Sequence, residues 1–137
     1  MKLYADEPDH GRIRALNVMV VSTLARVEVP AALWRKARIG ELDNEAAGRL
    51  VSAFEHDYHG DREVSPRFAI VSANERVLAA AAREVAHHGL RAYDAMQLAS
   101  ALAVRDTDPG CDAFACFDNE VRRAASRAGF SLVPEAA

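Results

Sequence analysis

The chain has 137 residues, of which half are hydrophobic and only 7% aromatic, so it fits one compact, helix-rich domain better than an all-β sandwich. Its 17 basic and 20 acidic residues give a formal net charge of −3. This charge lacks the basic excess typical of nucleic-acid-binding proteins, but it does not exclude a nuclease, whose carboxylates bind metal ions. The sequence has no apolar run of membrane-spanning length and no signal peptide, so we expect a cytoplasmic protein with a single domain over residues 1–137.

Apolar runs and capping signals predict the order of the elements. We expect a strand over 18–21, helices over 23–38 and 43–58, a strand over 68–71, helices over 74–88 and 92–106, a strand over 113–117, a helix over 118–128 and a strand over 130–133. Ser22 and Asp43 are the expected N-caps of the first two helices, and Gly89 follows the end of a later one. Pro30 lies inside the first helix and should kink it or mark a restart.

The predicted strands and helices alternate along the chain. The strands are apolar runs without polar alternation, a pattern typical of a parallel sheet that is covered on both faces. We therefore expect the α/β class, with helices on both sides of a central parallel sheet. Cys111 and Cys116 show no metal-binding spacing, and we expect both to be free thiols.

Two aspartates lie at the start of predicted helices. Asp118 directly follows an expected strand, at the sheet end where α/β proteins bind ligands, although it could merely cap the next helix. Asp94 shares the inward row of its helix with Leu98 and Ala101, although the helix dipole also favours an acid in the first turn. Each aspartate therefore has a structural and a functional interpretation.

Glu28 lies on an apolar stripe of the first predicted helix. Leu24, Val27 and Ala31 form this stripe, and we expect it to face the core. A buried carboxylate must be paired or bind a metal, because burial of a lone charge costs many kcal/mol. A salt bridge to a nearby arginine such as Arg26 is the structural alternative.

Together the three acids predict a metal site. Clustered carboxylates repel one another unless cations neutralise them, and oxygen ligands without Cys or His favour Mg²⁺, with Mn²⁺ as an alternative. Such a site suits phosphoryl transfer, because the metals generate hydroxide and stabilise the in-line transition state. We expect Glu28, Asp94 and Asp118 to be both metal ligands and catalytic residues, with Asp112 and Glu120 as less favoured additional ligands.

Several segments resemble the VapC toxins, which are PIN-domain ribonucleases. In the family's order these segments are residues 2–8 (the stretch after the family's first strand), 21–29 (the Glu-bearing helix), 90–101 (the central Asp) and 117–125 (the last Asp). The resemblance therefore extends over nearly the whole chain, and the segment around Asp94 is its most specific part.

The resemblance implies a PIN-like three-layer fold and a Mg²⁺-dependent endoribonuclease, the toxin of a type II toxin–antitoxin system. A metal-bound water would hydrolyse phosphodiester bonds in RNA of the tRNA or rRNA class, and a VapB-type antitoxin would inhibit the enzyme. A homodimer is also implied. Arg91 could steady an RNA phosphate, although a structural salt bridge is the alternative. Trp34 with Leu33 could belong to an antitoxin-binding groove, although core or dimer contacts explain them as well.

The sequence departs from the VapC pattern in two places. Cys116 stands where the family often has Thr, so a supporting hydroxyl is missing. The family's first strand and its essential Asp have no counterpart, and Met1 stands where the following apolar run should end. We expect a mis-called start codon, with an internal GTG read as the initiating Met.

Two other functions compete with the nuclease. One is a catalytically inactive, truncated PIN domain that acts as a binding module for the antitoxin or for a partner toxin subunit. The other is a receiver-like domain, which would need an acidic pair after its first strand and a Lys after its last full strand. Neither of these receiver features is visible in the sequence.

Overall fold

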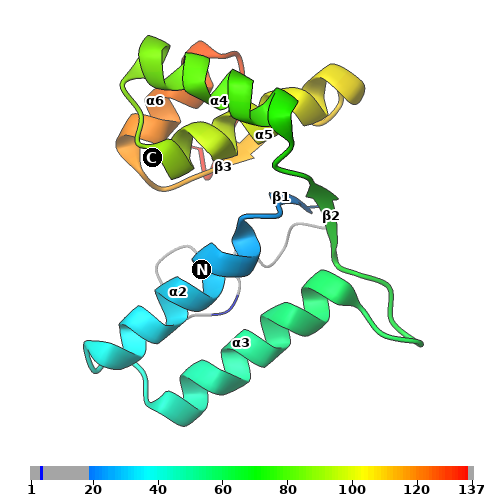
Figure 1. Cartoon of the computed structure of the whole chain (residues 1–137), viewed down its shortest axis with the longest axis vertical. Helices are drawn as coiled ribbons and strands as arrows, with labels where there is room; N and C mark the ends of the chain where they lie inside the picture. Colours follow the sequence, from blue (N-terminus) through cyan, green and yellow to red (C-terminus); the bar gives the residue numbers. More distant parts are fainter. Residues whose placement is uncertain (1–3, 5–18, 136–137) are drawn as a thin grey trace. The chain divides into compact units, whose positions relative to one another are not determined.

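The structure is a computed structural model that describes Tyr4 and residues 19–135. The chain divides into two compact units, residues 1–70 and residues 71–137, and we describe each by itself (Figure 1). The expectation of a missing first strand falls outside the described residues, as does most of the segment 2–8. The single-domain interpretation stays a prediction.

The first unit is built on two helices and a pair of strands. In chain order the elements are β1 (Met19–Ser22), α2 (Ala25–Arg38), α3 (Asn44–His59) and β2 (Phe68–Val71, which ends at the first residue of the second unit). Helices α2 and α3 pack side by side, and β1 pairs with β2 (Figure 1). The bounds of β2 are those that the sequence predicted.

Aromatic rings form the core of the first unit. Phe54 is almost fully buried, and its ring centroid lies 5.8 Å from that of Tyr58 and 6.2 Å from that of Phe68. Tyr4 packs edge-on against Phe54, and its hydroxyl donates a hydrogen bond to Asp57 Oδ2 at 2.7 Å. Burial of these large rings supplies much of the hydrophobic stabilisation of the unit.

The start of α2 differs from the prediction. Leu24, and not Ser22, occupies the N-cap position, and its backbone N–H donates to Ser22 Oγ at 3.3 Å. The helix then continues through Pro30 as a single element, so the predicted restart does not occur. Asp43 caps α3 as expected, because its Oδ1 accepts a hydrogen bond from the backbone N–H of Ala46 at 2.6 Å.

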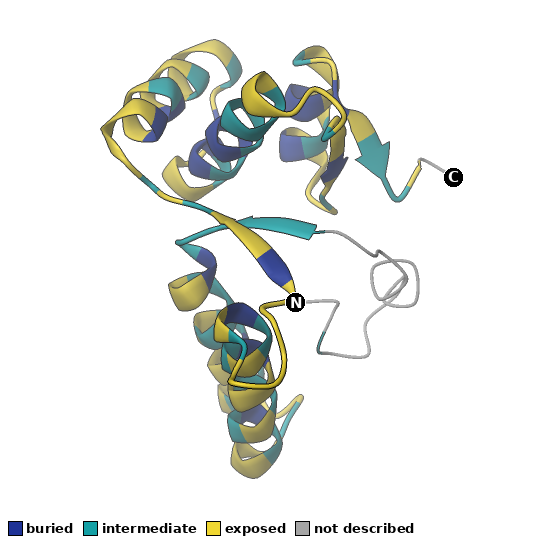
Figure 2. Cartoon of the chain, turned by 90° about the vertical axis from the view of Figure 1, so that its right-hand side faces the viewer, coloured by how far each residue is buried: buried dark blue, intermediate teal, exposed yellow. Residues whose placement is uncertain are grey.

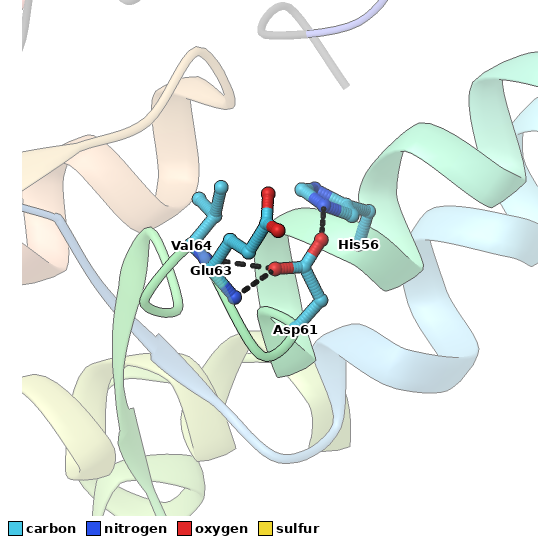
Figure 3. Close-up of polar contacts among 4 residues, drawn as sticks. All are labelled: His56, Asp61, Glu63 and Val64. Atoms are coloured by element: carbon cyan, nitrogen blue, oxygen red, sulfur yellow. Dashed lines mark hydrogen bonds and ion pairs between the residues drawn. The ribbon is translucent and has the colours of Figure 1, made fainter.

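A tight loop joins α3 to β2. Gly60 ends α3 with φ of +65°, and a Cβ at this position would lie 2.5 Å from the carbonyl oxygen of Val64. Asp61 Oδ1 accepts the backbone N–H groups of Glu63 and Val64, while its Oδ2 contacts His56 Nε2 at 3.0 Å (Figure 3). These bonds lower the pKa of Asp61 to about 2, with the backbone bond from Glu63 as the largest cause.

The second unit combines helices with two short strands. Its elements are α4 (Glu75–His88), α5 (Ala92–Thr107), β3 (Ala113–Ala115), α6 (Asn119–Arg127) and β4 (Ser131–Val133). Asn74 caps α4, and Gly89 ends it in the left-handed conformation. Helices α4 and α5 pack closely (Figure 1). The buried residues of the unit include Leu98, Ala99 and Ala125, and Figure 2 shows buried positions on its helices in dark blue.

Strands β3 and β4 are parallel, with Phe114 opposite Leu132. Two helices follow β1 before β2, and α6 connects the parallel strands β3 and β4, which together with this pairing confirms the α/β class. The described strands form two pairs, β1–β2 and β3–β4, where the sequence predicted one central sheet. Only Phe114 of β3 is buried, while Ala113 and Ala115 are exposed. Among the described residues, no helix is long and apolar enough to cross a membrane.

Candidate functional site

Asp94 lies in the first turn of α5. Its side chain is 26% exposed, while Ala95 and Leu98 on the same helix are fully buried, so the predicted inward placement is confirmed. Arg91 Nε lies 3.6 Å from Asp94 Oδ2, and the Arg91 side chain is 80% exposed. Arg91 therefore takes part in an ion pair that solvent screens strongly.

Asp118 is the N-cap of α6. Its Oδ1 accepts the backbone N–H of Glu120 at 2.9 Å and that of Val121 at 3.1 Å, so the capping role foreseen from the sequence is confirmed. Both bonds use the same carboxylate oxygen. Because a carboxylate has two oxygens, capping the helix and binding a cation are compatible for this residue.

The two aspartates share one electrostatic environment. Burial raises the pKa of Asp94 above its ordinary value, Arg91 opposes this effect, and the charges of Asp118 and Glu120 add to it. Burial likewise raises the pKa of the Cys116 thiol, and the charges of Asp118 and Asp94 raise it further. Asp118 and Glu120 are exposed, and they therefore lie near enough to Asp94 for their charges to act on its carboxylate.

Glu120 gains importance from this arrangement. From the sequence we expected Glu120 only as a less favoured ligand, yet its charge acts on Asp94. The available signal was its position two residues after Asp118, in the first turn of α6, where both acids are favoured by the helix dipole.

The predicted environment of Glu28 is wrong in one respect. Val27 is 62% exposed and Ala31 is exposed as well, so their stripe does not face the core. The buried residues of α2 are Ala25 and Leu33, which lie eight positions apart on another side of the helix. Glu28 is half-buried.

Glu28 belongs to the first unit, whereas Asp94 and Asp118 belong to the second. The meeting of these three carboxylates therefore stays a prediction. The alternative partner Arg26 lies 3.8 Å from Glu55, through its Nη2 and the carboxylate Oε2.

The donor chemistry of the second unit fits a hard divalent cation. Asp94 and Asp118 offer carboxylate oxygens, which Mg²⁺ and Mn²⁺ prefer, and a cation would offset the burial and the neighbouring negative charges that raise the pKa of Asp94. Within Tyr4 and residues 19–135, no group of three or more His, Cys, Asp or Glu side chains is arranged to hold a metal ion. These two residues would thus provide part of a site.

The family model of the PIN domain matches residues 1–126, a range that contains all three predicted ligands. The chain belongs to the PIN domain family. The PIN domain is a nuclease fold whose members are generally metal-dependent ribonucleases, so the acidic cluster at Asp94 and Asp118 lies in a domain suited to phosphodiester chemistry. We found no significant match among curated proteins or among solved structures.

The structure also gives the burial and contacts of several other residues of interest. Leu33 is fully buried, and Trp34 is 38% exposed. Lys36, one of three basic residues in the last turn of α2, forms an ion pair with Glu41. Cys111 and Cys116 are free thiols, as expected.

Proposed function

We propose that this PIN-domain protein is a metal-dependent endoribonuclease and the toxin of a VapC-type toxin–antitoxin system. The observation that carries the proposal is the electrostatic coupling of Asp94 with Asp118 and Glu120 within a domain of a nuclease family. Asp94 is partly buried while Asp118 and Glu120 are exposed, so this negative charge lies at a surface that a divalent cation can reach, and a divalent cation is the ligand that this family generally uses.

Asp94, Asp118 and Glu28 would hold the cation, with Mg²⁺ as the expected ion and Mn²⁺ as the alternative. The bound cation would supply Lewis acidity and neutralise charge at the scissile phosphate. Arg91, whose side chain is mostly exposed beside Asp94, would contact an RNA phosphate. Asp118 would keep its cap on α6 through Oδ1 while binding the cation through its other oxygen.

The expected partners follow from the same proposal. The likeness of residues 90–101 and 117–125 to VapC toxins supports an RNA substrate of the tRNA or rRNA class, a VapB-type antitoxin and a homodimer. It also supports a cytoplasmic location, where these RNAs are found.

The test compares the full chain with two substitutions on α5. RNA cleavage is measured with Mg²⁺, with Mn²⁺ and with chelator, for the unchanged protein, for Asp94→Asn and for Asp106→Asn. Asp106 is an exposed acid near the other end of the same helix, so its substitution matches the charge change without touching the cluster.

We expect metal-dependent cleavage that Asp94→Asn abolishes and Asp106→Asn leaves intact. Absence of cleavage by the unchanged protein under all metal conditions would refute the proposed ribonuclease activity. If that inactive protein still bound a VapB-type antitoxin, it would instead be a binding module.

A further inference from the structure

The segment that carries Asp118 is held at both of its ends. The backbone N–H of Cys116 donates to the carbonyl oxygen of Val133 at 3.1 Å, which extends the β3–β4 pairing by one residue. At the other end, Asp118 Oδ1 and the Asp118 carbonyl accept backbone N–H groups of α6. Between these anchors the chain must turn from the strand into the helix.

Arg122 joins the two sides of this turn. From α6, its Nη1 donates to the carbonyl oxygen of Cys116 at 2.7 Å, and its Nη2 donates to the carbonyl oxygen of Pro134 at 2.8 Å. One guanidinium therefore connects three parts of the chain, namely α6, the end of β3 and the residue that follows β4. The Arg122 side chain is half-buried, which strengthens both bonds relative to bonds at an exposed surface.

This arrangement depends on the shape of arginine. A guanidinium presents several N–H donors in a rigid plane, so it can bond two carbonyl oxygens at once without losing further side-chain freedom. Lysine keeps the positive charge but is a flexible point donor, and it cannot reproduce the planar bridge. The neighbouring Arg123 has no such role, because its side chain is exposed and its Nε donates to Asn119 within the same helix at 3.2 Å.

We propose that Arg122 is a positioning residue that fixes the Cys116–Asp118 turn and so holds the Asp118 carboxylate in the geometry needed for cation binding. The connection to a cation rests on the proposed nuclease function, whereas the clamp itself rests only on the hydrogen bonds. A small displacement of a reacting group lowers the rate steeply. Loss of the clamp therefore acts on the chemical step and leaves RNA binding largely unchanged.

The first experiment tests the clamp in the full chain without metal. Backbone hydrogen exchange is followed by NMR for the unchanged protein, Arg122→Lys, Arg122→Gln and the matched control Arg123→Lys. We expect the amides of Cys116 and Val121 to exchange about tenfold faster in both Arg122 variants, the effect of losing one charged hydrogen bond. The control should match the unchanged protein, and buried amides of α4 should exchange equally in all four proteins.

Unchanged exchange at Cys116 and Val121 in the Arg122 variants would overturn the clamp. A general acceleration that includes α4, or unfolding of both Arg122 variants, would also overturn it, because the residue would then act on global stability alone. Neither result depends on whether the protein is an enzyme.

The second experiment measures kcat and KM for RNA cleavage with Mg²⁺ in the same proteins. We expect kcat of Arg122→Lys to fall at least about tenfold while KM stays within about threefold, since only the transition-state geometry is affected. Faster exchange with unchanged kcat would overturn the positioning role but leave the nuclease intact. An inactive unchanged protein would refute the proposed function, and the link between Arg122 and cation binding with it, while the exchange data would still decide on the clamp.

Discussion

Replacement of Asp118 by Asn and by Ala separates its capping role from its proposed role as a ligand. The structure gives Asp118 Oδ1 two hydrogen bonds from the first turn of α6. Asn can accept the same bonds and is an equally good N-cap, whereas Ala accepts none and costs about 1 kcal/mol of unfolding free energy. In a protein of this size that loss lowers Tm by roughly 4 °C.

Stability is measured by urea denaturation followed by circular dichroism, with chelator present, and cleavage is measured with Mg²⁺. We expect Asp118→Asn to keep the stability of the unchanged protein and lose cleavage, and Asp118→Ala to lose both. Asp43→Ala is the matched control, because Asp43 caps α3 in the first unit through one bond to Ala46 and should reduce stability without reducing the rate. Cleavage retained in Asp118→Asn would refute the ligand role, and equal destabilisation by Asn and Ala would refute the capping argument.

Three further predictions follow from the described residues. The folded state raises the pKa of Asp94, so its contribution to stability is fully present below the ordinary value of 3.8 and is lost as the pH rises through the folded value. Asp94→Asn imitates the uncharged form of the side chain. With chelator at pH 7, this variant should therefore unfold at a higher urea concentration than the unchanged protein, and the difference should vanish below pH 3.8. A variant that is less stable at pH 7 would contradict this. Gly60→Ala should cost at least about 3 kcal/mol in a denaturant titration, because it combines a backbone region reserved for glycine with a clash against Val64. Gly89→Ala, which has a similar φ but open space around its Cβ, should cost only about 1 kcal/mol, and equal costs would refute the steric argument. The folded state lowers the pKa of Asp61 from 3.8 to about 2, so its contribution is present above pH 3.8 and is lost as the pH falls towards 2; acid denaturation curves of Asp61→Asn should lack this part of the pH dependence.

Local signals in the sequence predicted the elements well. Asp43 and Asn74 are the N-caps of α3 and α4, at the positions where the sequence predicted that these helices begin, and Gly89 follows the end of α4. These signals work because a cap involves residues only two or three positions apart. The prediction that Ser22 is an N-cap was wrong, because Leu24 occupies the cap position and the Ser22 hydroxyl only accepts a hydrogen bond from the Leu24 N–H.

The buried face of α2 was harder to predict. Valine and alanine occur on several sides of this helix, and the stripe through Val27 turned out to be exposed. The partner surface decides which apolar side is buried, and that surface belongs to the neighbouring helix α3, whose packing angle the sequence of α2 does not specify. For the same reason the sequence could nominate Asp94, Asp118 and Glu120 one by one, but only folding brought the start of α6 near Asp94.

The surroundings of Trp34 make the first unit separately observable. Trp34 is the single tryptophan of the chain; it lies on α2, and a Cβ added to Gly48 of α3 would be 4.0 Å from its ring. Its fluorescence emission therefore reports on the α2–α3 contact, while far-ultraviolet circular dichroism averages over the helices of both units. Superimposable melting curves from the two signals would reveal cooperative unfolding of the whole chain, and displaced curves would give each unit its own transition.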